Sequence, residues 1–347
     1  MPGARPDRGD GMTAQFWEAL PDDAVRCNLC AHACRIPRNK KGICGMRVNL
    51  RGKLVSLVEN IITSPHIDPV EKKPLYHFLP GSKVFSFGSA GCNFSCKFCQ
   101  NYAISCLPSK SGSVTGQRVE PAEVFRLAEQ QRASLVAFTY NEPTIFFELM
   151  FTVAGLLQST EKRSVIVTNG FMSEDCLLSL RRRISAANVD LKSFRETFYK
   201  EQCGGRLAPV LDTLNTIRLI GWWLEVTTLI IPGLNDSDDE IRDMARFIRD
   251  ELGPDTPWHL SAFHPAYLMG DREATTQGEL EHCWNVARGE GLNFVYLGNM
   301  GTPLGSNTLC PHCGTVCIER RKGRVASKMK AGGVCPNCDA PIPGVWE

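Results

Sequence analysis

Gly91-Cys92-Asn93-Phe94-Ser95-Cys96-Lys97-Phe98-Cys99-Gln100-Asn101 carries three cysteines in a C-x3-C-x2-C array on one short stretch. A [4Fe–4S] cube is ordinarily held by four thiolates, so three ligands leave one iron with an open coordination position. An open position on a metal is where chemistry takes place, as at catalytic zinc. A zinc knuckle or three unrelated buried thiols are the plainer alternatives, because free cysteine is among the most buried residue types. The three-cysteine spacing favours a catalytic cluster at Cys92, Cys96 and Cys99.

Composition narrows the class of protein. The chain has 347 residues, 16 cysteines and a formal net charge of +2, which argues neither for nor against a polyanionic partner. Most cysteines fall in C-x2-C or C-x3-C clusters, and without an apolar secretory signal these indicate metal sites in a reducing compartment. No run of about 18 apolar residues predicts a membrane span. We expect a cytoplasmic protein with a polar, disordered segment at residues 1–14, and either Met1 or Met12 as its start.

Short β-rich runs alternate with helical segments from Lys83 onward. We expect strands at 84–87, 135–138, 164–167, 186–191, 224–231, 258–263 and 294–297. We expect helices at 121–132 and 143–158, after the cap residue Ser173, from the capping box at 237–240 to 253, and around 279–288. Repeated strand–helix units imply a parallel sheet, and six or seven units fall short of the eight of a full barrel. The predicted fold is α/β, a partial (β/α)6 TIM-like barrel at residues 81–303 that is open on one side.

Two further cysteine groups flank this predicted barrel. Cys27, Cys30, Cys34 and Cys44 supply four thiolates, a full complement for zinc or for a closed cube, in an N-terminal module and linker at residues 15–80. We favour zinc there over an auxiliary cluster, because nothing in the sequence places the module near the main cysteine array. Cys310, Cys313, Cys335 and Cys338 form two C-x2-C knuckles at residues 304–347, which are typical of a structural zinc ribbon. A basic run at 319–324 could contact RNA or a protein partner, but a solvated loop is the better interpretation.

Polar residues stand where the predicted strands end, and the strand ends carry the chemistry of a parallel barrel. Besides the cysteine array, these residues are Asn141 and Glu142, Thr168 and Asn169, Asp190 and Lys192, Asn235 and Asp236, and His264. Each alone is more often a structural polar group, but six consecutive strand ends that carry such groups argue for one site. Asp190 and Lys192 fall on the same face of their strand because they are two residues apart.

The cysteine array, with the aromatic Phe98 before its last cysteine, resembles that of the radical S-adenosylmethionine (SAM) superfamily. In that superfamily the open iron binds the amino and carboxylate groups of SAM, and electron transfer into the sulfonium yields a 5′-deoxyadenosyl radical. Glu142-Pro143, Asp190-Leu191-Lys192 and His264 resemble motifs of its glycyl-radical-enzyme activases. The resemblance implies a [4Fe–4S] cluster, SAM as cofactor, and SAM contacts from Phe98, Asn141, Glu142, Thr168, Asn169, Asp190, Lys192 and His264.

Nearly the whole chain, from about Met12 to Trp346, resembles the radical SAM enzyme of the AmmeMemoRadiSam system. The matching motifs are the N-terminal cysteine module and the stretches 68–77, 99–101, 139–143, 232–236 and 341–346. This resemblance implies MEMO-type and AMMECR1-type partners and an electron donor such as flavodoxin or ferredoxin. It also implies hydrogen abstraction from a substrate that it does not identify, with macromolecules among the candidates.

Two other functions stay open. One is a glycyl-radical-enzyme activase of the pyruvate formate-lyase type, but the activases' Gly-Gly-Glu-Pro is here Tyr140-Asn141-Glu142-Pro143. Glu225 and Thr227 also stand in a region where activases place an arginine. The other is a non-catalytic iron–sulfur and zinc adaptor that holds protein or RNA partners. We therefore expect reductive SAM cleavage without assuming glycyl-radical generation.

Overall fold

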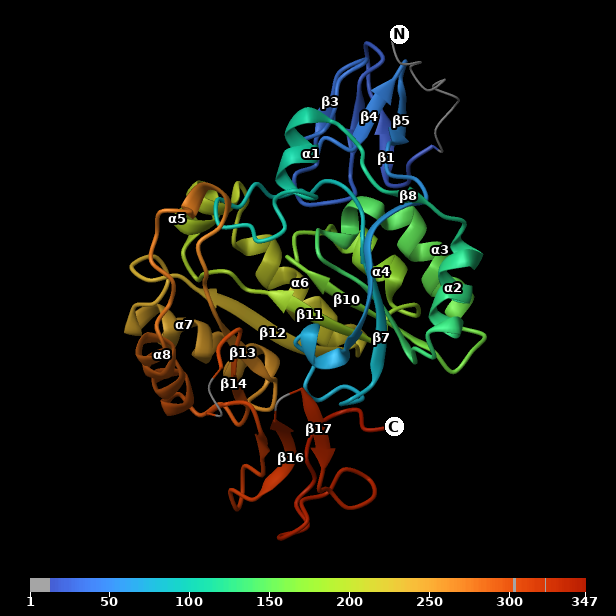
Figure 1. Cartoon of the computed structure of the whole chain (residues 1–347). Helices are drawn as coiled ribbons and strands as arrows, with labels where there is room; N and C mark the ends of the chain where they lie inside the picture. The colour runs from blue at the N-terminus through green and yellow to red at the C-terminus, as the bar shows by residue number, and fades with distance from the viewer. Residues whose placement is uncertain (1–12, 302–303, 322) are drawn as a thin grey trace.

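A nine-stranded sheet forms the centre of the protein, in a computed structural model that describes residues 13–301, 304–321 and 323–347 (Figure 1). The strand order is β14-β13-β12-β11-β10-β9-β7-β6-β8. The neighbours from β7 to β14 pair in parallel: β7 (Lys83–Gly88), β9 (Leu135–Phe138), β10 (Arg163–Thr168), β11 (Ala186–Asp190), β12 (Trp223–Ile230), β13 (Trp258–Ala262) and β14 (Val295–Gly298). Within the described residues β14 and β8 remain the two edges, so the sheet is open. The predicted α/β fold with an open, barrel-like sheet is confirmed.

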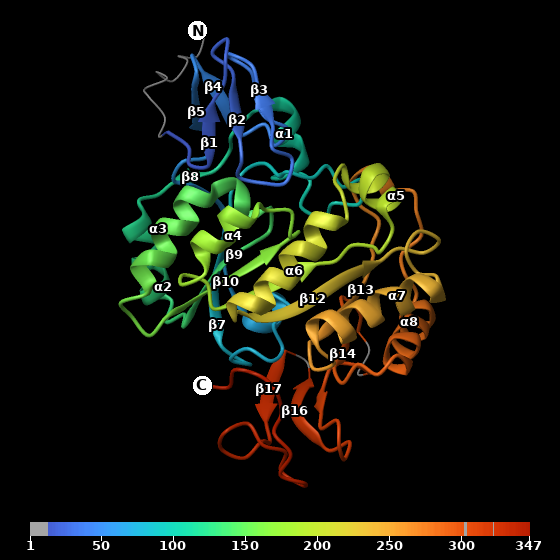
Figure 2. The same ribbon diagram turned by 180° about the vertical axis from the view of Figure 1, so that it is seen from behind.

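Helices connect the consecutive parallel strands. They are α2 (Pro121–Gln130), α3 (Phe147–Leu157), α4 (Glu174–Leu180), α6 (Ala208–Ile220), α7 (Asp238–Phe247) and α8 (Gln277–Gly289). Figure 2 shows α3, α4 and α6 lying across the sheet. Ser173 begins α4 as predicted, because its hydroxyl accepts a hydrogen bond from the Cys176 N–H at 3.3 Å, a cap that contributes about 1 kcal/mol. No helix in the described part of the chain is both long and apolar enough to span a bilayer.

Short elements join these units. They are α1 (Cys106–Ser111), α5 (Glu196–Phe198), the 3-10 turns η1 (Val70–Lys72), η2 (Pro143–Phe146) and η5 (Tyr267–Met269), and the π-helical segments η3 (Tyr199–Cys203) and η4 (Ile248–Leu252). The capping box predicted at the start of α7 is only half formed. Ser237 accepts from the Glu240 N–H at 3.4 Å, but the Glu240 carboxylate turns away to the Ser193 hydroxyl and to the Phe194 N–H at 2.9 Å. A tertiary contact therefore replaces the local one.

The segment between the N-terminal module and β7 contributes to the main sheet. β6 (Ile61–Pro69) pairs antiparallel with β7, and its first two residues also pair with the short β8 (Gln117–Arg118). The sequence predicts only a linker in this segment, and no strand. Pro65 falls in the register shift between Thr63 and His66, where a missing backbone donor is tolerated.

The N-terminal module consists of two small sheets. One contains β1 (Trp17–Ala19), β2 (Val25–Cys27) and β3 (Arg35–Ile36), and the other is the hairpin of β4 (Arg47–Leu50) and β5 (Lys53–Ser56). Of the segment expected to be disordered, residues 1–12 lie outside the described residues. Ala14 departs from that expectation, since it is buried and its N–H donates to the Leu54 carbonyl at 2.9 Å. Arg47 fastens the module to α3 through a buried ion pair with Glu148 at 2.7 Å.

The C-terminal ribbon contains β15 (Thr308–Leu309), β16 (Val316–Arg321) and β17 (Arg324–Ser327), and lies at the opposite end of the molecule from the N-terminal module (Figure 1). Its closing segment reaches the connector that precedes β7. Phe78 forms a β-bridge with Val345, and the His77 ring contacts the Pro343 carbonyl at 2.7 Å. Burial lowers the pKa of His77 to about 4. The ribbon therefore closes the end of the sheet at which the parallel strands begin.

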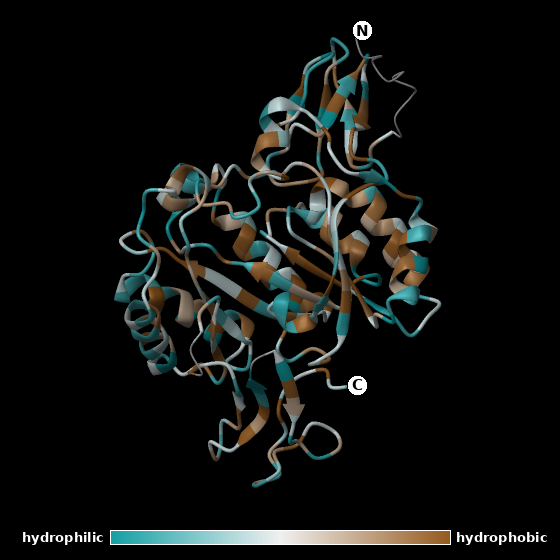
Figure 3. Cartoon of the chain, viewed as in Figure 1, coloured by the Kyte–Doolittle hydropathy of each residue, from teal (hydrophilic) through white to brown (hydrophobic). Residues whose placement is uncertain are grey.

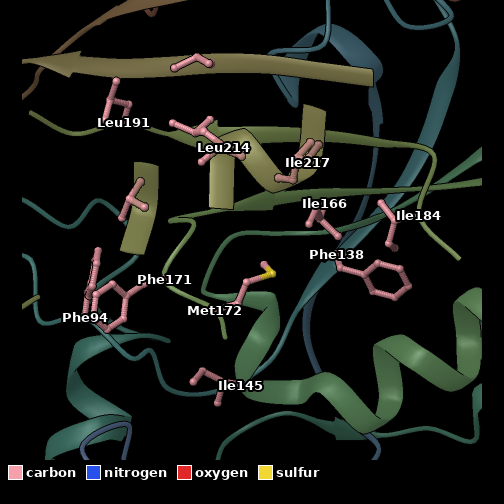
Figure 4. Packing of buried hydrophobic residues seen from close by; sticks show 14 of the residues in the cluster. Phe94, Phe138, Ile145, Ile166, Phe171, Met172, Ile184, Leu191, Leu214 and Ile217 are labelled. Atoms are coloured by element: carbon pink, nitrogen blue, oxygen red, sulfur yellow. The ribbon is translucent and has the colours of Figure 1, made fainter. Parts of the chain in front are cut away.

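The core lies between the sheet and its helices. In Figure 3, α3 and several of the parallel strands are largely brown (hydrophobic), whereas β12 also has polar stretches. Figure 4 shows how residues from strands, such as Ile166, meet residues from helices, such as Leu214 and Ile217. These three side chains are fully buried. Because this packing fixes the strands rigidly, the loops at their carboxyl ends have a stable base.

Candidate functional site

The cysteine array follows β7 as a loop that is held on two sides. The Ser95 and Lys97 N–H groups donate to the carbonyls of Cys203 and Gln202 at 2.8 and 2.9 Å. Gly91 has φ of 87° and lies so close to the N-terminal module that a Cβ there would stand 2.3 Å from Met46 Cγ. Glycine is therefore required at this position, and the module and the loop are in direct contact.

Two aromatic residues of the array anchor it. The Phe94 ring packs on Phe171 with ring centres 5.0 Å apart, as Figure 4 shows. The Phe98 ring packs against Phe198 at 5.8 Å and is faced on another side by the ammonium of Lys192. Phe98 thus forms an apolar wall between the cysteine loop and α5.

A cavity of about 340 Å³ opens beside the loop. All three array cysteines line it, together with most of the residues predicted to contact a cofactor, namely Phe98, Asn141, Glu142, Thr168, Asn169, Asp190 and Lys192. His264 is the exception among the described residues predicted for this role. Its side chain is exposed and contacts the Asn299 carbonyl at 3.1 Å, while its own carbonyl accepts a hydrogen bond from Gln100. Three thiols beside one cavity with polar walls fit an iron–sulfur cluster and a polar cofactor.

Glu142 ties the ends of two neighbouring strands, β9 and β10, together. Its Oε1 accepts hydrogen bonds from the Thr144 N–H at 3.1 Å, and from the hydroxyls of Thr144 and Thr168 at 2.6 and 2.8 Å. Its Oε2 accepts from the Asn169 N–H at 2.8 Å. Burial raises the pKa of this carboxyl group against the opposing effect of these donors. Most of the acceptor capacity of Glu142 is therefore used inside the protein.

Two asparagines brace the cysteine loop. Asn141 accepts from the Ser89 N–H at 2.9 Å and donates to the Gly91 carbonyl at 2.7 Å. Asn169 donates to the Asn93 side-chain oxygen at 2.7 Å, and the same amide nitrogen lies 3.8 Å from Cys92 Sγ. Burial raises the pKa of the Cys92 thiol well above its ordinary value. The amide of Asn169 is a weak donor placed next to that sulfur.

Asp190 and Lys192 form an ion pair at the end of β11, with Nζ and Oδ2 2.9 Å apart. Burial disfavours the charged ammonium, but the nearby Asp190 carboxylate outweighs it and raises the pKa of Lys192. Lys192 is also held through its backbone N–H, which donates to the Tyr199 hydroxyl at 3.0 Å. The cavity thus contains a fixed positive charge beside a half-buried carboxylate.

Several residues around the site were not predicted as part of it. The cavity is also lined by Lys72, Lys73, Gln100, Asn101, Ser105, Tyr140, Thr227, Leu229 and Ser261. Cys106 lies beside the array, and its hydrogen bond lowers the pKa of Cys99 to about 7. Cys203 of η3 lies next to Cys96. Cys106 and Cys203 are isolated in sequence and belong to no spacing motif, so only the fold could reveal their position.

The two outer cysteine groups lie at opposite ends of the sheet. Cys310, Cys313, Cys335 and Cys338 place their sulfurs within 4.8 Å of one another, an arrangement that could hold one zinc ion. Cys27, Cys30, Cys34 and Cys44 line one small cavity inside the N-terminal module. This cavity lies close to the array, because His32 contacts the Asn93 carbonyl at 2.8 Å. This proximity could not be predicted from the sequence.

Comparison with known proteins agrees with the site. The sequence profile described as the Radical SAM superfamily matches residues 87–248. Uncharacterized protein MJ0808 of Methanocaldococcus jannaschii is 39% identical over 307 residues, which are 88% of this chain and 91% of that protein. The isethionate sulfite-lyase activating enzyme of Nitratidesulfovibrio vulgaris is 26% identical over 52% of this chain and 61% of that protein. The crystal structure of Streptococcus suis SuiB bound to S-adenosylmethionine aligns with a TM-score of 0.50 at 13% identity, covering 67% of this chain and 53% of SuiB.

Proposed function

The chain belongs to the radical SAM superfamily, and we propose that it is an enzyme whose Cys92, Cys96 and Cys99 hold a [4Fe–4S] cluster for the reductive cleavage of SAM. The observation that carries this proposal is the convergence of the three thiols and the Asp190–Lys192 pair on one cavity. With cluster and SAM bound, one-electron reduction of the sulfonium would supply methionine and a 5′-deoxyadenosyl radical able to abstract hydrogen from a substrate carbon.

The residues of the chain contribute binding and orientation. Lys192 offers a buried positive charge that suits a carboxylate, and Asp190 offers an acceptor for an ammonium or a hydroxyl group. Asn141 and Asn169 hold the cysteine loop at the cavity wall. Glu142 keeps the neighbouring strand ends in register, so its role is to position Thr168 and Asn169. Phe98 provides an apolar wall that helps to keep water from a reactive intermediate.

We place this activity in an AmmeMemoRadiSam-type system, with MEMO-type and AMMECR1-type partners and flavodoxin or ferredoxin as electron donor. The similarity of motifs along nearly the whole chain supports this assignment. The open edge of the sheet and the exposed Lys72 at the cavity rim suit a large substrate, so we propose a macromolecule delivered by a partner. The many clustered thiols suit the reducing cytoplasm.

Glycyl-radical-enzyme activation is the second candidate, because several curated relatives are activating enzymes of this kind. In the region of β12, where activases place an arginine, this chain has Glu225 and Thr227. Glu225 is fully buried, pairs with His259 at 2.6 Å, and accepts from the Tyr76 and His77 N–H groups. Because Glu225 is not among the residues that line the cavity in the described chain, it offers nothing to a substrate there. We therefore favour SAM cleavage on a different substrate.

Anaerobic reconstitution with iron and sulfide, followed by dithionite reduction, tests the enzyme proposal. We expect the wild-type protein to release 5′-deoxyadenosine and methionine, detected by chromatography, and the Cys96→Ala variant to release neither. Cys283→Ala is the matched control, since it removes a buried thiol from α8, away from the cavity. Wild-type protein with a reducible cluster that forms neither product would refute the enzyme. Cellular function that survives Cys96→Ala would favour the adaptor.

Labelled substrates test the second half of the proposal. Deuterium at the reacting carbon should appear in 5′-deoxyadenosine when the true substrate is present. We expect transfer from a deuterated macromolecule mixed with its MEMO-type partner. Transfer from free small metabolites alone would contradict the macromolecular substrate while leaving SAM cleavage intact.

A further inference from the structure

The N-terminal cysteine module has an inner surface built for a bound group. Its four thiols line one cavity, and none of them forms a disulfide. The remaining lining is mainly apolar and comes from Leu29, Ile36, Ile43 and Ile145. Arg47 also faces this cavity and is balanced by its ion pair with Glu148. Four thiols around an apolar cavity suit a metal centre.

The distances between the thiol sulfurs distinguish a zinc site from an iron–sulfur cluster site. Zinc holds four sulfurs tetrahedrally at about 2.3 Å, so the sulfurs stand about 3.8 Å apart. The ribbon matches this arrangement, with Cys310–Cys338 and Cys313–Cys335 sulfur distances of 3.5 and 3.6 Å. Across the described residues, only the ribbon brings three or more such ligand atoms within 4.8 Å of one another. The sulfurs of the N-terminal set lie farther apart than those of the ribbon, as do the sulfurs of the Cys92 array. A [4Fe–4S] cube requires such a separation because each thiolate binds a different iron.

We infer that Cys27, Cys30, Cys34 and Cys44 hold a second [4Fe–4S] cluster rather than zinc, and that electrons reach the Cys92 loop through it. The metal assignment does not depend on the proposed SAM cleavage. The electron-transfer role does rest on that proposed function.

A short path joins the two cysteine groups. His32 lies between Cys30 and Cys34 in sequence, and its Nε2 is 2.8 Å from the carbonyl oxygen of Asn93, the residue after Cys92. A second contact is made at Gly91, where a Cβ would lie 3.1 Å from the Cys44 carbonyl oxygen. An electron can therefore pass from one group to the other through a few covalent bonds and one hydrogen bond.

The outer side of the module is basic. Arg35, Arg38, Lys40 and Lys41 are all exposed, and the nearby Asp23 pairs with Arg38 at 3.2 Å. Ile43, next to Cys44, is 60% exposed and adds an apolar point of contact. An acidic one-electron carrier fits such a surface. In the step, the reduced carrier loses one electron, the module's cluster gains it and then returns to its oxidised state as it passes the electron on, and no bond or proton is involved.

Metal analysis of a variant that lacks the main array tests the assignment. The triple variant Cys92→Ala, Cys96→Ala and Cys99→Ala leaves the N-terminal module and the ribbon unchanged. After anaerobic purification we expect about four irons and about one zinc per chain, with a spin-½ signal after dithionite. The ribbon zinc serves as the check on folding. Two zincs and no iron would overturn the inference, and so would one zinc with no iron.

Reduction kinetics test the electron-transfer role in protein with an intact array. Lys40→Glu with Lys41→Glu should slow cluster reduction by reduced flavodoxin at least tenfold and leave reduction by dithionite unchanged. Arg321→Glu with Arg324→Glu, at the opposite end of the molecule, is the matched control and should have no effect. Equal rates in both double variants would refute this role. Failure of SAM cleavage in the wild type under dithionite would instead refute the proposed function, with the metal content unaffected.

Discussion

The backbone N–H of Asn169 donates a 2.8 Å hydrogen bond to Oε2 of Glu142, so the residue after β10 is tied to the residue before η2. The sequence suggested Glu142 as a direct contact for the ammonium group of SAM. In the structure its carboxylate also accepts from Thr144 and Thr168, which leaves little capacity for a ligand. We therefore treat Glu142 as a positioning residue.

Glu142→Gln should destabilise the protein. The substitution keeps the size of the side chain but replaces one acceptor oxygen with an amide group that donates, and the neighbours of Glu142 are donors. One buried donor then loses its acceptor, which lowers the free energy of unfolding by about 1–3 kcal/mol. Denaturant titration of the apoprotein measures the change. Glu161→Gln, an exposed site, is the control, and equal stability of the two variants would contradict the bracing role.

Asp190→Asn should weaken SAM binding. It removes the charge that keeps Lys192 protonated in a buried place, so the pKa of Lys192 falls and the cavity loses part of its positive charge. We expect about tenfold weaker binding, which corresponds to about 1.4 kcal/mol, in equilibrium dialysis with reconstituted protein. Asp243→Asn breaks a comparable ion pair with Arg195 on the surface and should bind normally. Identical affinities would argue against a role for the Asp190–Lys192 pair.

Acid should destabilise the contact between connector and ribbon. Burial lowers the pKa of His77 to about 4 from an ordinary 6.5. The unfolded chain therefore binds the extra proton first, and stability is lost as pH falls from 6.5 toward 4, by about 3 kcal/mol in all. Unfolding free energies at pH 7 and pH 5 should differ less in His77→Gln than in the wild type. The variant His66→Gln, at an exposed site, should show the same change in unfolding free energy between pH 7 and pH 5 as the wild type. If His77→Gln also showed that change, His77 would not be the source of the acid sensitivity.

Chelation should remove one zinc per chain and loosen the ribbon. Structural zinc contributes on the order of 10 kcal/mol to the folding of such small modules, so its loss should lower the melting temperature of the ribbon end. Cys338→Ser should lose zinc, whereas Cys317→Ser should retain it, although Cys317 is buried near Cys310, Cys313 and Cys335. Metal analysis by mass spectrometry measures both. Zinc loss from the Cys317 variant would make that thiol a ligand.

The parallel strands could be predicted because they are fully buried, and a fully buried strand is a short apolar run between turn signals. The run at 135–138 is an example, since all four residues of β9 are buried. β6 lies in the segment predicted as a linker, and its two prolines and several polar residues give it no buried-strand pattern. Only its pairing with β7, across a bulge, makes it a strand.

The cavity was partly predictable for a similar reason. Residues at strand ends, such as Asp190 and Lys192, are placed by the repeating topology alone. Cys106, Cys203 and Lys73 belong to or directly follow the short elements α1, η3 and η1. The positions of these elements depend on tertiary contacts, so no periodicity in sequence could reveal them. His264 also follows a strand, but its side chain contacts the Asn299 carbonyl and does not line the cavity. A position at a strand end therefore does not ensure that the side chain faces the cavity.

The hydrogen bond between the His77 ring and the Pro343 carbonyl joins residues 266 positions apart. This separation affects how the chain folds during translation. A ribosome that adds roughly 5–20 residues per second needs on the order of tens of seconds to travel from one residue to the other. During that interval the connector at His77 and Phe78 has no ribbon to cover it. A nascent chain that stalls before Pro343 would keep this surface open and would become a target for chaperones and proteases.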